Sequence, residues 1–252
     1  MVKISKLKNK KQNKKVVGII MTYNCALLVA GTVKRIPLNS LDKLIIVDDG
    51  SKDDIASVAK ELNIPLFKHK HLGYGGNIKF GLKKALELGG DYLVEIHGDG
   101  QYDPKAIPTA IKKMKIGYDF MLGSRFTDLS QPLDDKMPLA RYLANIGLSF
   151  IDKLILRAPL TEYHSGFRVY SRKLLETVDL KTTSDDYLFS FEIIAQARFY
   201  NLPITEIPVR CNYKDDHTSA SILKSAIYSF QMCKVLALYL ISKAGFKTRL
   251  FR

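Results

Sequence analysis

Short apolar runs rich in β-branched residues alternate with stretches of helical periodicity through the first half of the chain. The predicted strands cover residues 16–21, 43–48, 65–69, 91–97 and 118–124. Helical periodicity continues from the first strand to about residue 35 and returns at residues 53–63, 76–89 and 104–115. Strands separated by helices of this length predict an α/β fold, in which helices flank a central, mostly parallel sheet connected by right-handed crossovers.

Three segments of the chain differ in composition. Residues 1–15 include seven lysines and no apolar stretch, which predicts a flexible basic tail and not a secretory signal. Residues 16–215 carry the alternating pattern and form the expected main domain. Residues 216–252 contain a mostly apolar stretch, 226–246, interrupted by one glutamine and two lysines, and end on the basic run KTRLFR. We expect an amphipathic helix there, which either packs on the core or lies in a membrane interface.

Composition and charge limit the function classes. A hydrophobic fraction of 46% and a charged fraction of 25% are ordinary for a globular chain and exclude extensive disorder. No run reaches the roughly 18 uninterrupted apolar residues of a membrane span. The net charge of +14 favours a polyanionic partner, with a lysine-rich proteome as the alternative explanation. Nucleic acid is not the expected partner, because the basic residues are not interleaved with stacking aromatics.

The three cysteines, Cys25, Cys211 and Cys233, are widely spaced and odd in number. This usage predicts a reducing, cytoplasmic location and no cysteine metal knuckle.

Polar clusters follow four of the predicted strands, at the point where each strand ends. They are TYN at 22–24, DDGS at 48–51, HGDGQ at 97–101 and GSRF at 123–126. In a parallel sheet the carboxyl ends of the strands meet at one edge, where ligands bind. We therefore expect one site to be built from these clusters.

The second cluster and the glycine-rich segment after it suit a nucleotide, although both have a simpler explanation. Asp48 or Asp49 could accept hydrogen bonds from a base or a ribose, or the segment could be a turn with Asp53 capping the next helix. The segment HLGYGGNIKFG, 71–81, opens a helix whose N–H groups suit a diphosphate, or it forms a tight turn.

The stretch EIHGDGQYDP, 95–104, carries metal-ligand chemistry. Asp99 and Gln101 present two hard oxygen ligands at alternate positions, which suit Mg²⁺ or Mn²⁺ completed by water and by the phosphates of a nucleotide. His97, at the preceding alternate position, would be acceptable to Mn²⁺ and poor for Mg²⁺. The alternative for His97 is a hydrogen-bonded histidine at a strand end.

Together these residues resemble glycosyltransferase family 2, inverting enzymes of the Rossmann-like GT-A fold that use nucleotide-diphosphate sugars. Eight motifs occur in the same order as in the dolichol-phosphate mannose or glucose synthase branch, across roughly residues 16–215. They are IIMTYN, IIVDDGS, GYGGNIKFGLKKAL, HGDGQYDP, MLGSRF, the helix with Arg141, YHSGFRVYSR and ITEIPVR.

The resemblance implies roles for individual residues. The implied donor-binding residues are Thr22, Tyr23, Asn24, Asp48, Asp49, Ser51 and Gly76. The implied metal ligands are Asp99 and Gln101, with His97 in the place of the first Asp of the D-x-D motif. The implied acceptor-binding residues are Arg125, Arg141, Asn145 and Ser165, with Glu162 as an acidic residue beside them. Asp99, Arg125, Arg141 and Glu162 are the expected catalytic group, and Lys214 or His217 could serve the diphosphate.

The expected function is transfer of a hexose from a UDP- or GDP-sugar to a polyprenyl phosphate, by an enzyme bound to the cytosolic face of an anionic membrane. A phosphate acceptor is already ionised, so it needs arginines that position it more than a base that activates it. A saccharide hydroxyl as acceptor would instead require Glu162 or His164 as the base. The other alternative is a nonenzymatic nucleotide-sugar-binding protein, because the metal motif is altered.

Overall fold

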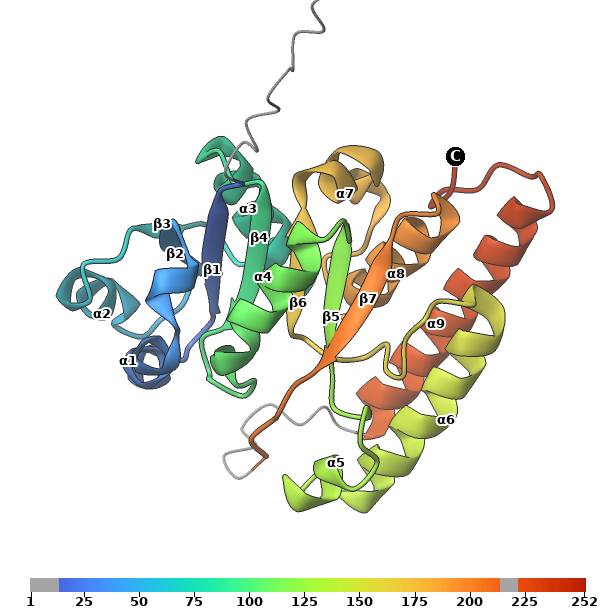
Figure 1. Cartoon of the computed structure of the whole chain (residues 1–252), viewed down its shortest axis with the longest axis horizontal. Coiled ribbons are helices and arrows are strands. Elements are labelled where there is room, and N and C mark those ends of the chain that lie inside the picture. Colours follow the sequence, from blue (N-terminus) through green and yellow to red (C-terminus); the bar gives the residue numbers. More distant parts are fainter. Residues whose placement is uncertain (1–13, 214–221) are drawn as a thin grey trace, which may run out of the picture.

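A computed structural model of the chain describes residues 14–213 and 222–252. Its centre is a seven-stranded sheet in the order β3-β2-β1-β4-β6-β5-β7 (Figure 1). The strands are β1 (Val16–Thr22), β2 (Lys43–Asp48), β3 (Leu66–Lys68), β4 (Tyr92–His97), β5 (Phe120–Ser124), β6 (Arg168–Ser171) and β7 (Ile204–Pro208). All neighbouring strands pair in parallel except β6, which is antiparallel to β4 and to β5. The predicted mostly parallel α/β architecture is confirmed.

The helices fall between the strands as the periodicity predicts. They are α1 (Ala26–Arg35), α2 (Ile55–Glu61), α3 (Tyr74–Glu87), α4 (Ile107–Lys115), α5 (Gln131–Asp134), α6 (Leu139–Leu156), α7 (Arg172–Thr177), α8 (Phe189–Phe199) and α9 (Ile222–Lys243), with 3-10 turns η1 (Leu38–Ser40), η2 (Pro104–Ala106) and η3 (Leu180–Thr182). Predicted and observed boundaries in the first half of the chain differ by three residues or fewer, because alternation and helical periodicity are local signals.

The sheet separates two apolar layers. Alternate residues of β1 point to opposite faces, so Val17 and Ile19 pack with α3 on one side while Val16 and Ile20 pack toward α1 and α4 on the other. The first layer also includes α7, α8 and α9, and the second includes α2. Burial on both faces explains why the central strands consist of continuous apolar runs.

The direction of each strand decides which loops meet. Because β1, β2, β4 and β5 run in the same direction, their last residues, Thr22, Asp48, His97 and Ser124, lie at one edge of the sheet. The antiparallel β6 brings its amino-terminal end to that same edge, and with it the segment 161–167. The site is therefore assembled from four carboxyl ends and one amino end.

The segment 126–137, between β5 and α6, contains the short helix α5. Asp128 starts this turn by accepting hydrogen bonds from the backbone N–H and the hydroxyl of Ser130, at 2.9 and 2.8 Å. After the helix, Asp135 Oδ1 accepts from Arg210 Nε at 3.0 Å and Nη2 at 2.6 Å. These long-range bonds attach the segment to the end of β7, which no local sequence signal shows.

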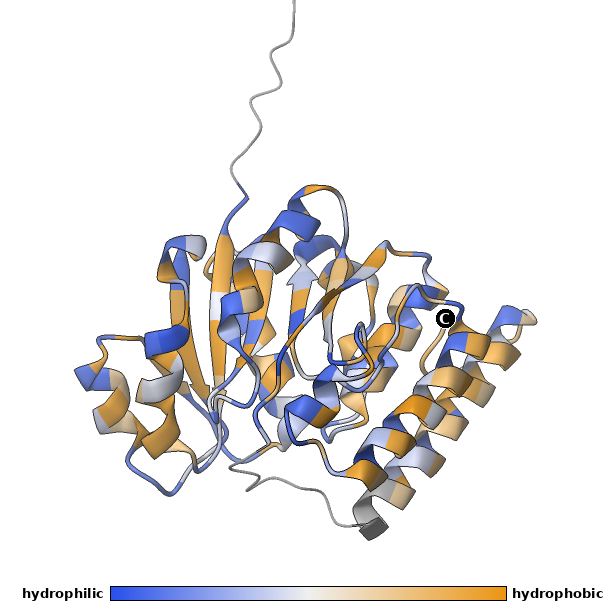
Figure 2. Ribbon diagram, turned by 60° about the horizontal axis from the view of Figure 1, so that its bottom comes forward, coloured by the Kyte–Doolittle hydropathy of each residue, from blue (hydrophilic) through white to orange (hydrophobic). Residues whose placement is uncertain are grey.

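The amphipathic helix expected at the end of the chain is α9, which lies beside α6 at one end of the molecule (Figures 1 and 2). Its inner side buries Met232, Val235, Leu236 and Tyr239 in the core, as the core-packing alternative predicts. Among the described residues, none of the helices combines the length and the hydrophobicity needed to cross a bilayer. The basic tail at residues 1–13 lies outside the described residues, whereas Lys15 is hydrogen-bonded to Asp91 through its backbone N–H at 2.9 Å.

Candidate active site

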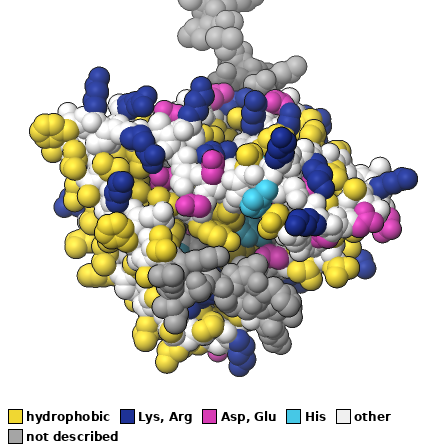
Figure 3. Space-filling view, turned by 180° about the vertical axis from the view of Figure 1, so that it is seen from behind, with side chains coloured by type: hydrophobic (Ala, Val, Ile, Leu, Met, Phe, Trp, Pro, Cys, Tyr) yellow, Lys and Arg dark blue, Asp and Glu magenta, His cyan; other side chains and the backbone are white. Residues whose placement is uncertain are grey.

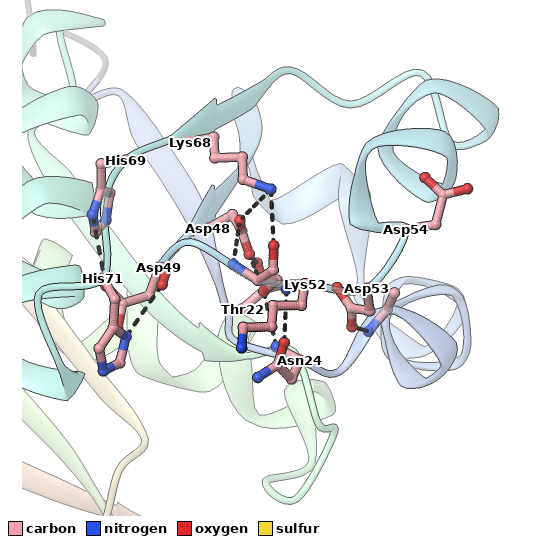
Figure 4. Close-up of polar contacts among 12 residues, drawn as sticks. Thr22, Asn24, Asp48, Asp49, Lys52, Asp53, Asp54, Lys68, His69 and His71 are labelled. Carbon is pink, nitrogen blue, oxygen red and sulfur yellow. Dashed lines mark hydrogen bonds and ion pairs between the residues drawn. The ribbon is translucent and has the colours of Figure 1, made fainter.

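Asp48, at the end of β2, holds the first two loops of the site together (Figure 4). Its carboxylate accepts hydrogen bonds from Ser51 N at 3.0 Å, from the Ser51 hydroxyl, and from Thr22 Oγ1 at 3.2 Å. Lys68 Nζ lies 3.5 Å away, and the Asp48 side chain is fully buried. The structure thus brings the predicted donor residues together, but Asp48 contacts the protein and presents no exposed oxygen.

Asn24 and Ser51 join the loop after β1 to the loop after β2. Asn24 N donates to Ser51 Oγ at 2.8 Å, and Asn24 Oδ1 accepts from Lys52 N at 2.9 Å. Asn24 has a φ of 49°, in the left-handed region that asparagine tolerates better than most residues. These bonds set the direction in which the neighbouring Tyr23 leaves the loop.

Asp49 anchors the glycine-rich segment after β3. Its carboxylate accepts from Leu72 N at 2.6 Å and from Gly73 N at 3.1 Å, and His71 Nδ1 lies 2.8 Å from it. Asp49 is buried, whereas the His71 side chain is exposed at its rim. Asp49 therefore shapes the wall of the site by folding this segment back against β2 (Figure 4).

The amino end of α3 is occupied by the chain itself. The N–H groups of Gly75 and Gly76 both donate to the carbonyl oxygen of Asp185, at 2.8 and 3.1 Å. A Cβ at Gly75 would lie 2.7 Å from the carbonyl oxygens of Ser184 and Asp186, so glycine is required for this close packing. In this conformation the N–H groups expected to suit a diphosphate are satisfied internally, as the tight-turn alternative predicts.

An exposed aromatic pair lies at the entrance of the donor side. Tyr23 is 49% exposed, and its ring stacks on that of His71 with centroids 4.6 Å apart and planes inclined by 28°. The two rings come from the loops that Asn24, Ser51 and Asp49 hold in place. A flat aromatic surface of this kind can stack a nucleobase.

Asp99 and Gln101 follow β4 and are half-buried. Asp99 Oδ1 accepts from Gln101 N at 3.0 Å, which leaves Asp99 Oδ2 and the Gln101 side chain without a hydrogen bond to any described residue. No cluster of three or more histidine, cysteine or acidic side chains suited to a metal occurs in the described parts of the chain. These residues fit a divalent cation whose remaining ligands are phosphate oxygens and water, and they do not fit a closed all-protein cage.

His97, the third predicted ligand, is hydrogen-bonded to Glu95. Its Nε2 lies 3.0 Å from Glu95 Oε1, and Glu95 is buried and also accepts from the hydroxyl of Tyr170. Burial acts to lower the pKa of His97 and to raise that of Glu95, but their hydrogen bond and opposite charges outweigh it, so the pKa of His97 is raised and that of Glu95 is lowered. His97 therefore has only Nδ1 left to reach a metal, and the hydrogen-bonded alternative describes its main contact.

Arg125 and Glu162 form a buried ion pair at the end of β5. Glu162 accepts from Arg125 N at 2.7 Å, from Nε at 2.8 Å and from Nη2, and the remaining Arg125 nitrogen, Nη1, donates to the Tyr213 hydroxyl at 2.7 Å. Both charged side chains are at least 94% buried, with 6% and 0% exposure. Nε and Nη2 of Arg125 both donate to Glu162, and Nη1 donates to the Tyr213 hydroxyl. The Arg125 guanidinium is therefore fixed from two sides.

Arg141 lies over the Tyr213 ring, with its guanidinium carbon 5.8 Å from the ring centroid. Asn145, one helical turn further along α6, is half-buried, and its amide nitrogen lies 4.0 Å from Met137 Sδ. Ser165 is fully buried, and its Oγ accepts from Phe167 N at 3.3 Å. Arg141 thus lies against Tyr213 and Asn145 against Met137, whereas Ser165 supports the turn that leads into β6.

The segment 210–213 connects the loop that carries Asp99 and Gln101 to Arg125 and Arg141. Residues 210–213 run antiparallel to residues 101–103, with Asn212 N donating to Gln101 O at 2.8 Å and Asp103 N donating to Arg210 O at 3.1 Å. This pairing delivers Tyr213 to the two arginines. Tyr102 belongs to the paired segment 101–103. Burial raises the pKa of Tyr102 to about 12, although the charge of Arg125 acts to lower it. The segment 210–213 therefore links the loop that carries Gln101 to the side chains of Arg125 and Arg141.

Three residues of this site were not predicted from the sequence. Tyr213 bridges the two arginines, Glu95 binds His97, and His71 stacks on Tyr23. Only Glu95 could have been found from the sequence, because it is a carboxylate within an apolar strand. A carboxylate buried in a strand needs a partner. Lys214 and His217, expected near the diphosphate, lie outside the described residues.

The pattern of the family described as Glycosyl transferase family 2 matches residues 19–179, which include the loops after β1, β2, β4 and β5. This protein belongs to glycosyl transferase family 2. It is accordingly a glycosyltransferase, and the family resemblance of the motifs is confirmed.

Relatives with similar sequences carry related names. The chain is 31% identical, over 217 residues, to the UDP-N-acetylglucosamine–dolichyl-phosphate N-acetylglucosaminyltransferase of Methanococcus voltae, covering 78% of this chain and 85% of that one. It is 24% identical, over 174 residues, to the polyprenol monophosphomannose synthase of Mycolicibacterium smegmatis, covering 66% and 65%.

Solved structures share the fold. The glucosyl-3-phosphoglycerate synthase of Mycobacterium tuberculosis, in a complex with Mn²⁺, UDP and phosphoglyceric acid, superposes with a TM-score of 0.65 over 94% of this chain and 80% of that one, at 14% identity. The same enzyme has been crystallised with Mn²⁺ and UDP-glucose, and superposes with a TM-score of 0.66. The family 2 chain described here therefore has the GT-A fold, whose neighbours bind a divalent metal and a UDP-sugar.

Proposed function

We propose that this family 2 enzyme is an inverting transferase that moves a hexose from a UDP- or GDP-sugar to a polyprenyl phosphate at the cytosolic face of an anionic membrane. The observation that supports the proposal is the pairing of residues 210–213 with 101–103, which connects the loop of Asp99 and Gln101 to Tyr213, the residue that both Arg125 and Arg141 contact. A leaving diphosphate and an incoming phosphate are both anions, and a site with adjacent cation-binding and arginine-lined parts suits both. The names of the relatives support a lipid-phosphate acceptor.

Each part of the site has a task in this proposal. Tyr23 and His71 stack the nucleobase, and the bonds of Asp48, Asp49, Asn24 and Ser51 hold those two rings in position. Asp99 and Gln101 hold Mg²⁺ or Mn²⁺, which when bound would neutralise charge on the leaving diphosphate. Arg141 and the Arg125–Tyr213 pair orient the acceptor phosphate toward the opposite face of the sugar carbon.

Among the described residues, the two expected as a base for a saccharide acceptor, Glu162 and His164, both have buried side chains, which supports an acceptor that is already ionised. Glu162 is fully buried, and its carboxylate oxygens accept three hydrogen bonds from Arg125, so it is unsuited to abstract a proton. His164 Nε2 lies 3.3 Å from the buried Asp152, and Nδ1 lies 3.4 Å from the Tyr228 hydroxyl. Glu162 is fully buried and the His164 side chain is 7% exposed, so neither is open to an incoming saccharide hydroxyl, which favours the phosphate.

The proposal is tested by incubating the purified chain with radiolabelled UDP- and GDP-hexoses, a short polyprenyl phosphate and Mn²⁺ or Mg²⁺. Label that moves into the organic phase is the expected result. Label found only in a water-soluble glycan would replace the proposal with an enzyme that glycosylates a saccharide hydroxyl. Nucleotide-sugar binding without turnover on any acceptor would favour the nonenzymatic alternative.

Replacing Arg141 with alanine is expected to raise the KM for the lipid phosphate by roughly 10- to 100-fold, the cost of losing a charge-assisted contact. The KM for the sugar donor should stay within about twofold, because the proposal assigns Arg141 to the acceptor phosphate and not to the donor. Steady-state kinetics with a water-soluble short-chain acceptor measures both constants. Lys153→Ala removes a positive charge further along the same helix and serves as the control. An equal rise in both KM values would contradict the assignment.

Replacing Tyr23 with alanine is expected to weaken nucleotide binding roughly tenfold or more, because base stacking on an aromatic ring contributes about 1–3 kcal/mol. Isothermal titration with UDP and with GDP in the presence of Mn²⁺ provides the dissociation constants. Tyr118→Ala, at the opposite edge of the sheet before β5, is the matched control and should bind like the unaltered chain. Unchanged nucleotide affinity in Tyr23→Ala would remove the aromatic pair from the donor site.

A further inference from the structure

The outer sides of α6 and α9 form an exposed apolar surface. Phe150 on α6 and Phe230 on α9 are 68% and 75% exposed. We call this surface the α6–α9 face and define it by its large exposed side chains, which are Leu143, Phe150 and Leu154 of α6 and Ile227, Phe230 and Ile241 of α9. Figures 1 and 2 show the two helices side by side at the outer end of the molecule, and hydrophobic side chains gather on that side in Figure 3.

Helical spacing makes this surface continuous. Positions 143, 150 and 154 are seven and four residues apart, so their side chains share one side of α6, and Gly147 between them leaves that side smooth. The buried residues of α6, Ser149, Asp152 and Leu156, lie on the other side of the helix. The exposed residues of α6 therefore form a second apolar side of the helix, separate from the side that packs on the core. This many adjacent exposed apolar side chains indicate an interaction surface.

The charges around the face select its partner. Neither helix has an exposed carboxylate among the described residues, because the one acidic residue, Asp152, is buried against His164. The exposed charges are those of lysines and arginines, with Lys153 on α6, Lys234 on α9, and Arg157 and Lys247 beyond the helix ends. A second copy of the chain would present the same positive charges to this face, whereas anionic lipid headgroups complement them.

We propose that the α6–α9 face docks on an anionic lipid bilayer, with both helices lying in the plane of the interface and their large apolar side chains inserted below the headgroups. An apolar side flanked by lysines and free of carboxylates is the pattern of interfacial helices. One consequence of docking, the position of the acceptor residues, rests on the proposed function. Since α6 also carries Arg141 and Asn145, docking would hold the acceptor side of the enzyme at headgroup level, where the phosphate of a polyprenyl lipid lies.

The test is co-sedimentation of the full chain with vesicles made of equal parts phosphatidylcholine and phosphatidylglycerol, and with pure phosphatidylcholine vesicles. We expect binding to the anionic vesicles that weakens at high salt. The triple variant F150S/L154S/F230S should lose affinity by roughly 100-fold or more, on the order of tenfold for each large side chain withdrawn from lipid. The double variant I116S/L38S removes side chains that are 72% and 53% exposed but lie elsewhere, and should bind like the unaltered chain.

Two outcomes would overturn the proposal. One is vesicle binding by the triple variant that equals that of the control. The other is a dimer in analytical ultracentrifugation without lipid that only the triple variant disrupts, since the face would then bind a second copy. A charge-reversed variant, K153E/K234E, gives a second readout, because its binding should fall on anionic vesicles while its unfolding curve stays unchanged.

Docking and catalysis can fail separately. Transfer to a water-soluble short-chain acceptor requires no bilayer, so the triple variant should keep its turnover in that assay. Normal transfer together with no vesicle binding in the unaltered chain would reject the docking proposal and leave the proposed function intact. Vesicle binding without transfer to any polyprenyl phosphate would reject the proposed function and leave docking intact.

Discussion

Asp99→Asn is expected to lower metal-dependent turnover by roughly 100- to 1,000-fold, which corresponds to losing the ion that stabilises charge on the leaving group. Asp99 is the carboxylate of the HGDGQ loop, and its Oδ2 makes no hydrogen bond to any described residue. Asparagine keeps the size of the side chain and can keep the bond from Gln101 N, so the loop should retain its shape. What the substitution removes is the negative charge that a hard cation needs.

Two measurements separate this effect from a general loss of structure. Turnover is measured with the donor sugar and polyprenyl phosphate, and Mn²⁺ affinity is measured in the presence of UDP by electron paramagnetic resonance. Asp103→Asn, four residues further along the same loop, is the matched control, because Asp103 accepts a bond from Lys105 N and caps η2. Wild-type Mn²⁺ affinity and turnover in Asp99→Asn would show that the metal is held elsewhere.

Glu162→Gln is expected to reduce the free energy of unfolding by about 3–5 kcal/mol, because it leaves the buried Arg125 guanidinium without a counter-charge. Glu162 is fully buried, and Arg125 donates to it through its backbone and its side chain. The surrounding protein cannot hydrate the remaining positive charge, so solvation does not offset the loss. Urea unfolding of the purified chain provides the measurement.

A second variant distinguishes charge from shape. In E162Q/R125Q both charges of this pair are removed, and most of the lost stability should return although the transferase activity should not, since Arg125 then no longer positions the acceptor. Glu61→Gln, at the exposed end of α2, is the control and should unfold like the unaltered chain. A loss of stability in the double variant that equals or exceeds that of Glu162→Gln would contradict the explanation by unpaired charge.

The loops after β2 and β3 could be predicted from the sequence in part. The sequence predicts that DDGS and the glycine-rich segment lie together, and they do, because both follow parallel strands. It does not show that Asp49 and the carbonyl of Asp185 take up the N–H groups of Leu72, Gly73, Gly75 and Gly76. Asp185 is more than a hundred residues away along the chain, and buried N–H groups donate to whichever oxygen the tertiary fold brings to them.

The acceptor side depends still more on long-range contacts. The order of motifs identifies Arg125, Arg141 and Glu162 as candidates, but their separation along the chain leaves open whether they meet. Their meeting depends on the antiparallel direction of β6, which carries Glu162 to the carboxyl edge, and on the pairing of residues 210–213 with 101–103. Neither feature has a local signal, because strand direction and loop pairing are decided by which hydrogen bonds close in the complete sheet.

The sequence by itself determined the α/β class, most element boundaries, the edge at which the site lies and the family, since these depend on local periodicity and on residues adjacent in the chain. Only the tertiary structure decided which of the polar residues bind one another, and that α9 packs its inner side on the core while leaving an apolar outer side exposed beside α6. The physical reason is burial. A carboxylate, an arginine or a helix face acquires its role from the partners that desolvate it, and distant parts of the chain supply those partners.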